Sequence, residues 1–378
     1  MDRPLGPLIR LLAALLALPV LVPALLPATA HADAPTLTPG SHAITLPTDA
    51  PATFRLERTA TGSTLHVGLW YVGAGDSVGE GVRLTIGTTP ADTGCGSGAV
   101  FRPTIGEPAP LLTTTASTWT DEAEHPCGTV EELFVTVGVP SDPLDGGRAA
   151  TLVVEEEPPL SAYAFDLLRE PADPAWEPVD PGPSAEPVAA GATPADAPVV
   201  EPGSHEVRVR PGRQAVVGIP VDWDQSLRAQ VDGSTEATVT ILGPVLGEDV
   251  ASSAPGQAQS WVTSYLHRNS FDPTRAGASL AGVRYVLVGL PPDATPATVT
   301  LTLAVDGSPG DGVPDYAVAS PSGSPVPDRS TDPADDDSAP TPIWIGAGAL
   351  VVLVAVALGV RRHRGRRPTR RGARARGR

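Results

Sequence analysis

Two short sequence motifs each occur twice in the chain, and this internal repeat constrains the fold more than any other feature. Residues 38–44 (TPGSHAI) recur as 201–207 (EPGSHEV), and residues 133–140 (LFVTVGVP) recur as 285–291 (YVLVGLP). The matches occur in the same order in both copies, as expected for two domains of common ancestry and not for a long solenoid. The repeat therefore predicts two units that share one architecture.

Each unit is patterned as β-strands. Polar and apolar residues alternate in 204–210, which is the period of a half-buried strand, and turn signals such as Pro211-Gly212 separate the short runs. Apart from two apolar segments near the ends of the chain, no apolar stripe of helical period exceeds two turns. About six to eight strands per unit at this spacing predict an all-β chain of two tandem jelly-roll or β-sandwich domains.

Proline and acidic residues set the boundaries of these domains. The first β-sandwich is predicted at 33–170 and the second at 201–307, and each is long enough to bury its own core. The Pro-, Ala- and acid-rich residues 171–200 have little to bury and are predicted as a linker. Residues 308–342 hold eight prolines and an acidic cluster, which predicts a disordered, semi-rigid stalk.

The two ends of the chain carry membrane signals. Residues 1–32 have the pattern of a signal peptide cleaved after Ala32 or, failing that, after Ala30, and an uncleaved anchor is the alternative. Residues 343–360 are apolar and uncharged, and as a transmembrane helix they would rise about 27 Å. Ten arginines in 361–378 predict a cytoplasmic tail. We therefore expect a single-pass protein of the cell membrane with an extracellular N-terminus.

The part between the membrane signals is strongly acidic. The whole chain has a net charge of -17 and no lysine, and residues 33–342 hold 42 Asp and Glu against 14 Arg. Such a surface repels nucleic acid. The simplest interpretation is a soluble, non-sticky exterior, and attraction of cations or basic partners is the alternative.

Cys95 and Cys127 are the only cysteines. An even pair outside the membrane predicts one disulfide. Closing a loop of this length would stabilise the fold by about 3–4 kcal/mol. A metal pair or a redox couple would need a CxxC spacing or nearby histidine ligands, and no such arrangement is seen in the sequence.

The second unit resembles the pre-peptidase C-terminal domain group. The resemblance is carried by the opening run 203–205 (GSH), the step 209–212 (VRPG) and the strand 215–219 (AVVGI). It implies jelly-roll β-sandwiches over roughly residues 36–306. The Lys-free, Ala/Pro/Arg-rich chain with a stalk and an anchor is also similar to actinobacterial surface proteins with tandem modules. Some of those contain a von Willebrand-type A domain, but residues 222–226 (DWDQS) depart from its DxSxS metal motif, so no metal site is carried over.

Few residues point to catalysis. His42 and His205 occupy the same position of the repeat, which favours a shared structural role over a catalytic one. No nucleophile elbow, zinc motif or phosphate-binding glycine loop occurs. We therefore predict no catalytic residue, no metal site and no cofactor.

The long insertion of each unit offers the best candidates for binding. These candidates are Phe101 and Trp119 in residues 96–126, and Trp261 and Tyr265 in residues 249–280. Long loops on a rigid sandwich commonly carry binding, and an exposed aromatic side chain is a frequent anchor. The alternative is that each aromatic residue covers the open end of its own sandwich.

These features predict a non-enzymatic surface protein that displays two β-sandwich binding modules outside the cell. Its partner would be an extracellular protein or a cell-wall polymer, and not nucleic acid. Two other hypotheses remain: an accessory or scaffold subunit of a membrane or secretion complex, and a hydrolase whose site the sequence does not reveal.

Overall fold

The computed structural model describes residues 34–74, 79–102, 110–120, 122, 124–269, 272–310 and 312–316. The predicted signal peptide, most of the predicted stalk, the predicted transmembrane helix and the predicted cytoplasmic tail lie outside these residues. In the part that the structure describes, no helix is long and apolar enough to cross a membrane. All described residues belong to one compact unit.

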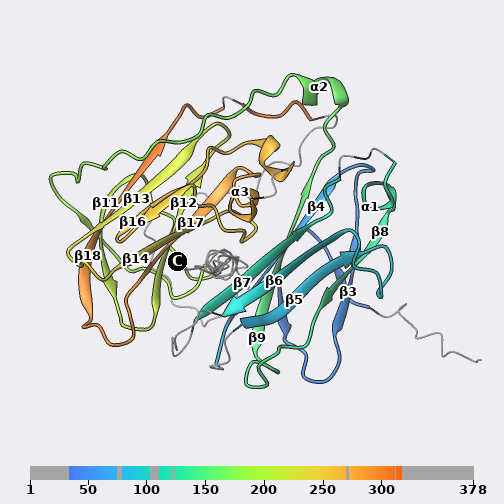
Figure 1. Ribbon diagram of the computed structural model, residues 1–378, viewed down its shortest axis with the longest axis horizontal. Coiled ribbons are helices and arrows are strands. Elements are labelled where there is room, and N and C mark those ends of the chain that lie inside the picture. The colour runs from blue at the N-terminus through green and yellow to red at the C-terminus, as the bar shows by residue number, and fades with distance from the viewer. Residues whose placement is uncertain are drawn as a thin grey trace, which may run out of the picture. The chain divides into compact units, whose positions relative to one another are not determined.

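The first half of the described chain forms two sheets that enclose one core (Figure 1). One sheet has the strand order β1–β3–β8–β5–β6, and the other has the order β2–β9–β4–β7. Leu56 and Leu84 of the five-stranded sheet pack with Leu69 and Leu152 of the four-stranded sheet, and all four are fully buried. The strands are β1 (Thr36–Leu37), β2 (Gly40–Thr45), β3 (Ala52–Glu57), β4 (Thr64–Val72), β5 (Gly79–Gly87), β6 (Gly96–Arg102), β7 (Leu111–Ser117), β8 (Glu132–Val137) and β9 (Ala149–Glu157).

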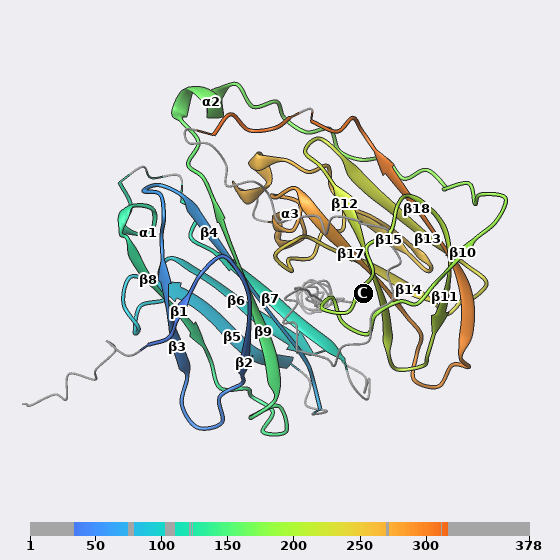
Figure 2. The same ribbon diagram turned by 180° about the vertical axis from the view of Figure 1, so that it is seen from behind.

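The second half forms another pair of sheets with its own core (Figure 2). The six-stranded sheet has the order β10–β11–β18–β13–β16–β15, and the three-stranded sheet has the order β12–β17–β14. Val207 and Leu301 of the larger sheet pack with Val217 and Val286 of the smaller one. The strands are β10 (Glu186–Val188), β11 (Gly203–Val209), β12 (Gln214–Val221), β13 (Ser226–Asp232), β14 (Thr238–Leu242), β15 (Ser252–Ala254), β16 (Gln257–Gln259), β17 (Gly282–Gly289) and β18 (Ala297–Asp306).

The two pairs of sheets share a strand order. The order β2–β9–β4–β7 in the first pair corresponds to β11–β18–β13–β16 in the second, and β3–β8–β5 corresponds to β12–β17–β14. The pairs differ at the edges, where the first adds β1 and β6 and the second adds β10 and β15. In both halves the first and last main strands are neighbours in one sheet, β2 with β9 and β11 with β18.

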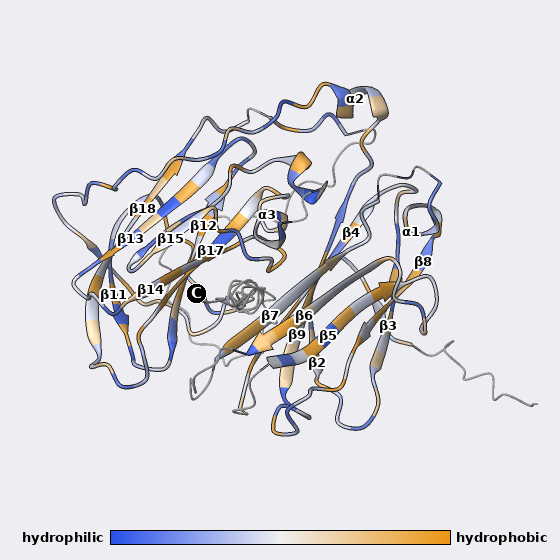
Figure 3. Cartoon of the chain, in the orientation of Figure 1, coloured by the Kyte–Doolittle hydropathy of each residue, from blue (hydrophilic) through white to orange (hydrophobic). Residues whose placement is uncertain are grey.

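The residue pattern explains these strands. In β11, Val207 and Val209 are fully buried, whereas Glu206 and Arg208 are exposed, as the alternation in 204–210 predicts. Figure 3 shows the same alternation of hydrophobic and hydrophilic residues along other strands. Burial of each valine contributes roughly 1.5–3 kcal/mol. The prediction of an essentially all-β chain is confirmed for the described residues.

Residues 171–200 lie along the second pair of sheets. Strand β10 pairs in parallel with β11. The N–H of Val179, a buried residue, donates to Gln230 Oε1 at 3.2 Å, and the N–H of Gly182 donates to Ser204 Oγ at 2.9 Å. Although the sequence suggested that this segment has little to bury, it is packed, because the residues between its prolines still offer N–H donors and small apolar side chains to the sheet.

The predicted disulfide is present. Cys95, just before β6, is bonded to Cys127 in a short helix, and their Cα atoms are 5.2 Å apart. Arg58 stabilises the helical side by donating to the carbonyl of Cys127 at 2.6 Å. The helices are short: α1 (Pro126–Thr129), α2 (Ala162–Asp166), the 3-10 helix η3 (Tyr265–Asn269) and α3 (Pro273–Ala276).

A third apolar cluster joins the two pairs of sheets. It combines Leu111 and Trp70 of the four-stranded sheet with Val216 and Leu287 of the three-stranded sheet, and it includes Leu246 from the loop after β14.

This loop sits directly on β4. A Cβ atom added at Gly68 would lie 2.6 Å from both Leu246 Cδ1 and Val245 O, so only glycine allows the approach. Leu246 has a left-handed backbone (φ 76°), which costs roughly 1–3 kcal/mol, and its side chain is fully buried in the third cluster. The contact between the two pairs of sheets, which we call the first and the second sandwich, therefore holds Leu246 in place.

Candidate functional site

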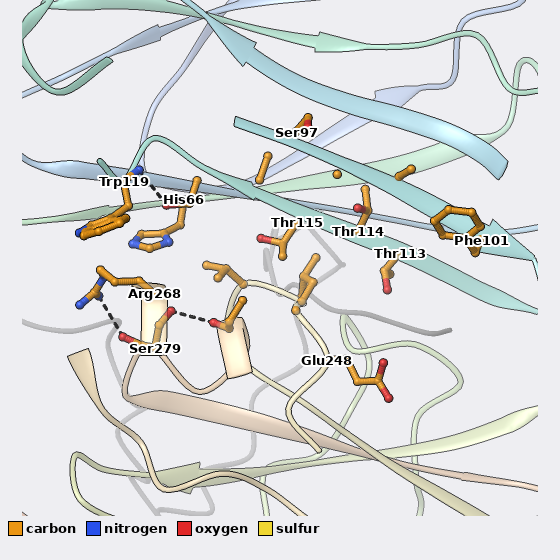
Figure 4. A pocket seen from close by; sticks show the side chains of 18 residues that line it. His66, Ser97, Phe101, Thr113, Thr114, Thr115, Trp119, Glu248, Arg268 and Ser279 are labelled. Carbon is orange, nitrogen blue, oxygen red and sulfur yellow. Dashed lines mark hydrogen bonds between the residues drawn. The ribbon is translucent and has the colours of Figure 1, made fainter. Parts of the chain in front are cut away.

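A cavity of about 390 Å³ lies beside this contact (Figure 4). Strands β6 and β7 of the first pair of sheets form one wall. Residues 245–248, Arg268 of η3, Ala276 of α3 and Ser279 form the other. The volume falls within the roughly 300–1,000 Å³ that is usual for ligand sites.

Strand β7 supplies a row of hydroxyl groups to the cavity. Because side chains alternate along a strand, Leu112 and Ala116 enter the first core, whereas Thr113, Thr115 and Ser117 point to the opposite face. The second pair of sheets covers that face, so these hydroxyls line a partly closed space instead of meeting bulk water.

The hydroxyl groups differ in what they already bind. Thr115 Oγ1 donates to the carbonyl of Val67 at 3.3 Å, and Ser117 Oγ accepts from the N–H of Trp119 at 3.2 Å. Thr113 is 4% exposed, and its Oγ1 has no hydrogen-bond partner among the described residues. Since buried polar groups are nearly always paired, this hydroxyl is available to a ligand or to water.

Two glycines of β6 allow this strand to pack closely against β7. A Cβ atom at Gly98 would lie 2.2 Å from Thr115 O, and one at Gly96 would lie 2.3 Å from Ser117 O. The close approach covers the outer edge of β7, which is the last strand of its sheet. The cavity wall is therefore built from two strands of different sheets.

Aromatic side chains lie at both ends of the cavity. Figure 4 shows Trp119 beside His66 at one end and Phe101 near Thr113 at the other. Burial raises the pKa of Tyr265, whereas the side chain of Trp119 lies close enough to its hydroxyl to lower that pKa, so a residue of the first sandwich neighbours one of the second.

Tyr265 stands behind the cavity wall. Its side chain is 7% exposed, its ring lies 6.2 Å from the ring of Phe165 in a T-shaped arrangement, and the guanidinium carbon of Arg268 lies 3.4 Å from its centroid. This packing fixes the tyrosine beside Trp119.

A buried ionic cluster stands at the Trp119 end. Arg268 forms an ion pair with Glu157, the hydroxyl of Tyr316 donates to Glu157 Oε1 at 2.6 Å, and His66 Nε2 lies 3.4 Å from Glu157 Oε2. Burial acts to raise the pKa of Glu157, but the charge of Arg268 and the bond with His66 outweigh it and lower that pKa. Burial lowers the pKa of His66, so the imidazole is neutral at physiological pH.

Two further carboxyl groups have raised pKa values. Glu155 lies opposite His66 on the paired strands β9 and β4. Burial and the negative charge of Glu157 raise the pKa of Glu155 to about 7. Burial, followed by the charges of Asp272 and Asp249, raises the pKa of Glu248 at the Phe101 end of the cavity.

The structure brings together three of the four aromatic residues predicted for binding. Phe101 and Trp119 line the cavity, and Tyr265 supports Trp119. Trp261 does not line the cavity. Its indole N–H donates to Thr274 Oγ1 at 3.2 Å, and the guanidinium of Arg275 covers its ring at 3.9 Å.

The paired histidines make equivalent contacts. His42 Nε2 lies 2.6 Å from the carbonyl of Thr38, and His205 Nε2 lies 2.9 Å from the carbonyl of Glu201, four residues before it in each case. This local bond accounts for their shared position in the repeat. Within the described ranges, no group of three or more His, Cys, Asp or Glu residues is placed to hold a metal ion.

Sequence reasoning missed His66, Glu248 and the hydroxyl row of β7. The run Thr113-Thr114-Thr115 inside an apolar strand was the available signal, because three β-branched hydroxyl residues in a strand give one face a row of hydrogen-bonding groups. His66 sits in a strand whose other side chains are mostly apolar, and nothing in its neighbours indicates a carboxylate partner 91 residues away.

No family model matches the chain, and no curated protein matches it. Among solved structures, the chain is similar to the CUB1-EGF-CUB2 domain of human MASP-1/3, with 10% identity, 70% of this chain and 99% of that chain covered, and a TM-score of 0.17. It is also similar to the CUB1-EGF-CUB2 domains of rat MASP-1, with 8% identity, 71% and 98% covered, and a TM-score of 0.17. At TM-scores this low, neither likeness supports a conclusion about this chain.

Proposed function

We propose that the chain is a non-enzymatic, membrane-anchored surface protein that binds an extracellular ligand in the cavity between its two sandwiches. The observation that carries the proposal is the cavity itself: both sandwiches build it, aromatic side chains stand at its ends, and a buried hydroxyl inside it has no partner among the described residues. Convergence of a few polar groups in an enclosed space is typical of ligand sites.

The two sandwiches are, in this proposal, duplicated jelly-roll modules similar to the pre-peptidase C-terminal group. Their shared strand order supports the duplication because it coincides with the matched sequence runs, 38–44 with 201–207 and 133–140 with 285–291. Placement of the first main strand beside the last is the arrangement of a jelly roll. The edge strands β6 and β15 differ between the copies, and in the first copy β6 forms part of the cavity wall.

The proposed location rests on the sequence and on the disulfide. The apolar run 343–360 with its following arginines would anchor the protein, and residues 1–32 would direct export. A disulfide between Cys95 and Cys127 fits an oxidising compartment outside the cytoplasm.

The geometry favours binding over hydrolysis. A catalytic triad needs a hydroxyl within about 2.6–3.2 Å of its histidine. Ser117 lies opposite His66 on neighbouring strands, but the described residues show no hydrogen bond from a serine or threonine hydroxyl to His66. Ser117 Oγ is instead engaged by the N–H of Trp119.

Capture experiments test this function. Purified full-length protein is incubated with isolated cell wall and, separately, with detergent-solubilised membrane, alongside variants Trp119→Ala and Glu248→Ala and the control Trp261→Ala. We expect the unmodified protein to be captured by wall material or by an extracellular protein. Both cavity variants should lose this capture, and the control variant should keep it. Equal capture by all four proteins would show that the cavity is not the site. Capture of a membrane protein that both cavity variants retain would favour an accessory subunit instead.

A further inference from the structure

We infer that the cavity recognises a short segment of neutral sugar units in a polysaccharide or glycan. This inference rests on the proposed function and names its ligand class. A sugar ring presents hydroxyl groups around its rim and C–H groups on its faces, so a matching site needs hydroxyl or carboxylate partners along a wall and aromatic surfaces at the ring faces.

The wall meets the first requirement. Thr113 Oγ1 is buried and unpartnered among the described residues, and the hydroxyls of Thr115 and Ser117 follow it along the same face of β7. Each hydroxyl donates one hydrogen bond and accepts two, so Thr115 and Ser117 keep capacity beyond their internal bonds. A polyhydroxylated ligand satisfies such a row, whereas an apolar ligand would leave it unpaired at a cost.

The ends meet the second requirement. Figure 4 shows Trp119 and Phe101 at opposite ends of the labelled row, with Glu248 on the side of Phe101. The backbone N–H of Trp119 donates to Ser117 Oγ, and its side chain lies beside the hydroxyl of Tyr265, so the ring is in place before a ligand arrives. Glu248 forms no ion pair within the part of the chain that the structure describes, which leaves its carboxylate oxygens available to accept from sugar hydroxyls.

The charge balance favours a neutral sugar over an acidic one. Among the described residues of the cavity lining, Arg268 is the one arginine, and it is already paired with Glu157 and donates to the carbonyl of Ser279 at 3.0 Å. His66 is neutral because burial lowers the pKa of its imidazole. An anionic group would thus meet no uncompensated positive charge among the described residues of the lining, and it would face Glu248.

The topology disfavours an extended peptide. Peptides that bind by strand addition need an open strand edge. The edge of β7 that faces the cavity is covered by β6, whose Gly96 and Gly98 approach the carbonyls of Ser117 and Thr115 too closely to admit another chain.

Titration calorimetry on the full-length protein tests the inference. The probes are trisaccharides of glucose, galactose, mannose and N-acetylglucosamine, with a trisaccharide of glucuronate as the anionic counterpart of the glucose trisaccharide. The variants are Trp119→Ala and Thr113→Val, which removes the hydroxyl and keeps the shape. Thr53→Val on β3 is the matched control, since the Thr53 hydroxyl lies outside the cavity, 3.4 Å from that of Thr136.

We expect at least one neutral trisaccharide to bind, and the glucuronate trisaccharide to bind more weakly than the glucose trisaccharide. Loss of one hydrogen bond should raise the Kd about threefold to tenfold in Thr113→Val. Loss of the aromatic surface should raise it more than tenfold in Trp119→Ala, and Thr53→Val should match the unmodified protein. If Trp119→Ala does not fold, Thr113→Val still tests the inference.

Three results would overturn the inference. If no probe binds while capture by wall material still depends on Trp119, the ligand is not a simple sugar, although the cavity remains the binding site. If the glucuronate trisaccharide binds more tightly than the glucose trisaccharide, the site selects an anion. If a sugar binds equally to the unmodified protein and to Thr113→Val and Trp119→Ala, it binds elsewhere.

Discussion

At the scale of single residues, the cluster around Glu157 places one carboxyl group in an unfavourable position. Glu155 and Glu157 project from the same face of β9, and one arginine, Arg268, serves both. Glu157 keeps its charge because Arg268 and His66 contact it, whereas Glu155 is protonated up to a pH of about 7. The fold thus accommodates the second carboxyl group in its neutral form.

This arrangement predicts that stability falls as the pH rises. The folded-state pKa of Glu155, about 7, exceeds the ordinary glutamate pKa of 4.5, so the folded state binds the extra proton between these values, and the penalty is complete above pH 7. For this partly buried group we expect a loss on the order of 1–3 kcal/mol between pH 5 and pH 8. Glu155→Gln should reduce this slope and unfold at a higher denaturant concentration at pH 8, while the raised pKa values of Glu248 and Asp249 keep part of the slope.

Chemical denaturation at several pH values measures the effect. The matched control is Glu206→Gln, a change at an exposed position of β11. If Glu155→Gln and the unmodified protein show the same pH slope, the account of the cluster is wrong.

At the scale of elements, the contact between the sandwiches depends on one glycine. The loop after β14 can approach β4 only because Gly68 has no side chain, and Leu246 then enters the third apolar cluster. Gly68→Ala should therefore weaken the contact and destabilise the protein by about 1–3 kcal/mol through overpacking. Both sandwich cores should persist, since Gly68 faces away from the first core.

Limited proteolysis with fragment mapping checks this prediction. We expect faster cleavage in residues 243–248 of Gly68→Ala than in the unmodified protein. Gly182→Ala is the control, because a Cβ atom there meets its nearest neighbours at 3.7 Å, an ordinary contact. Unchanged cleavage in Gly68→Ala would mean that the loop does not need this close approach.

The strands themselves could be predicted from the sequence, but the way in which they assemble could not. Alternation in 204–210 predicted β11 because side-chain period is a local property. The approach of Leu246 to Gly68 joins residues far apart in the chain and depends on shape, which local patterns do not encode. For the same reason Phe101 and Trp119 could be named as candidates, but their enclosure with Glu248 in one cavity could not.

At the scale of the whole molecule, the two sandwiches are not independent domains joined only by a linker. Residues 171–200 pack along the second pair of sheets, and Tyr316, which follows the last strand, bonds to Glu157 of the first pair. These contacts make the cavity a property of the assembled chain, because neither sandwich supplies both of its walls.

Hydrogen exchange measured by mass spectrometry, on full-length protein with and without the sugar that binds most tightly, tests this claim most directly. The account predicts that the ligand slows exchange in both walls together, in residues 111–119 of the first sandwich and in residues 243–249 and 265–279 of the second. Protection confined to one sandwich, or located away from these segments, would contradict a binding site built by both.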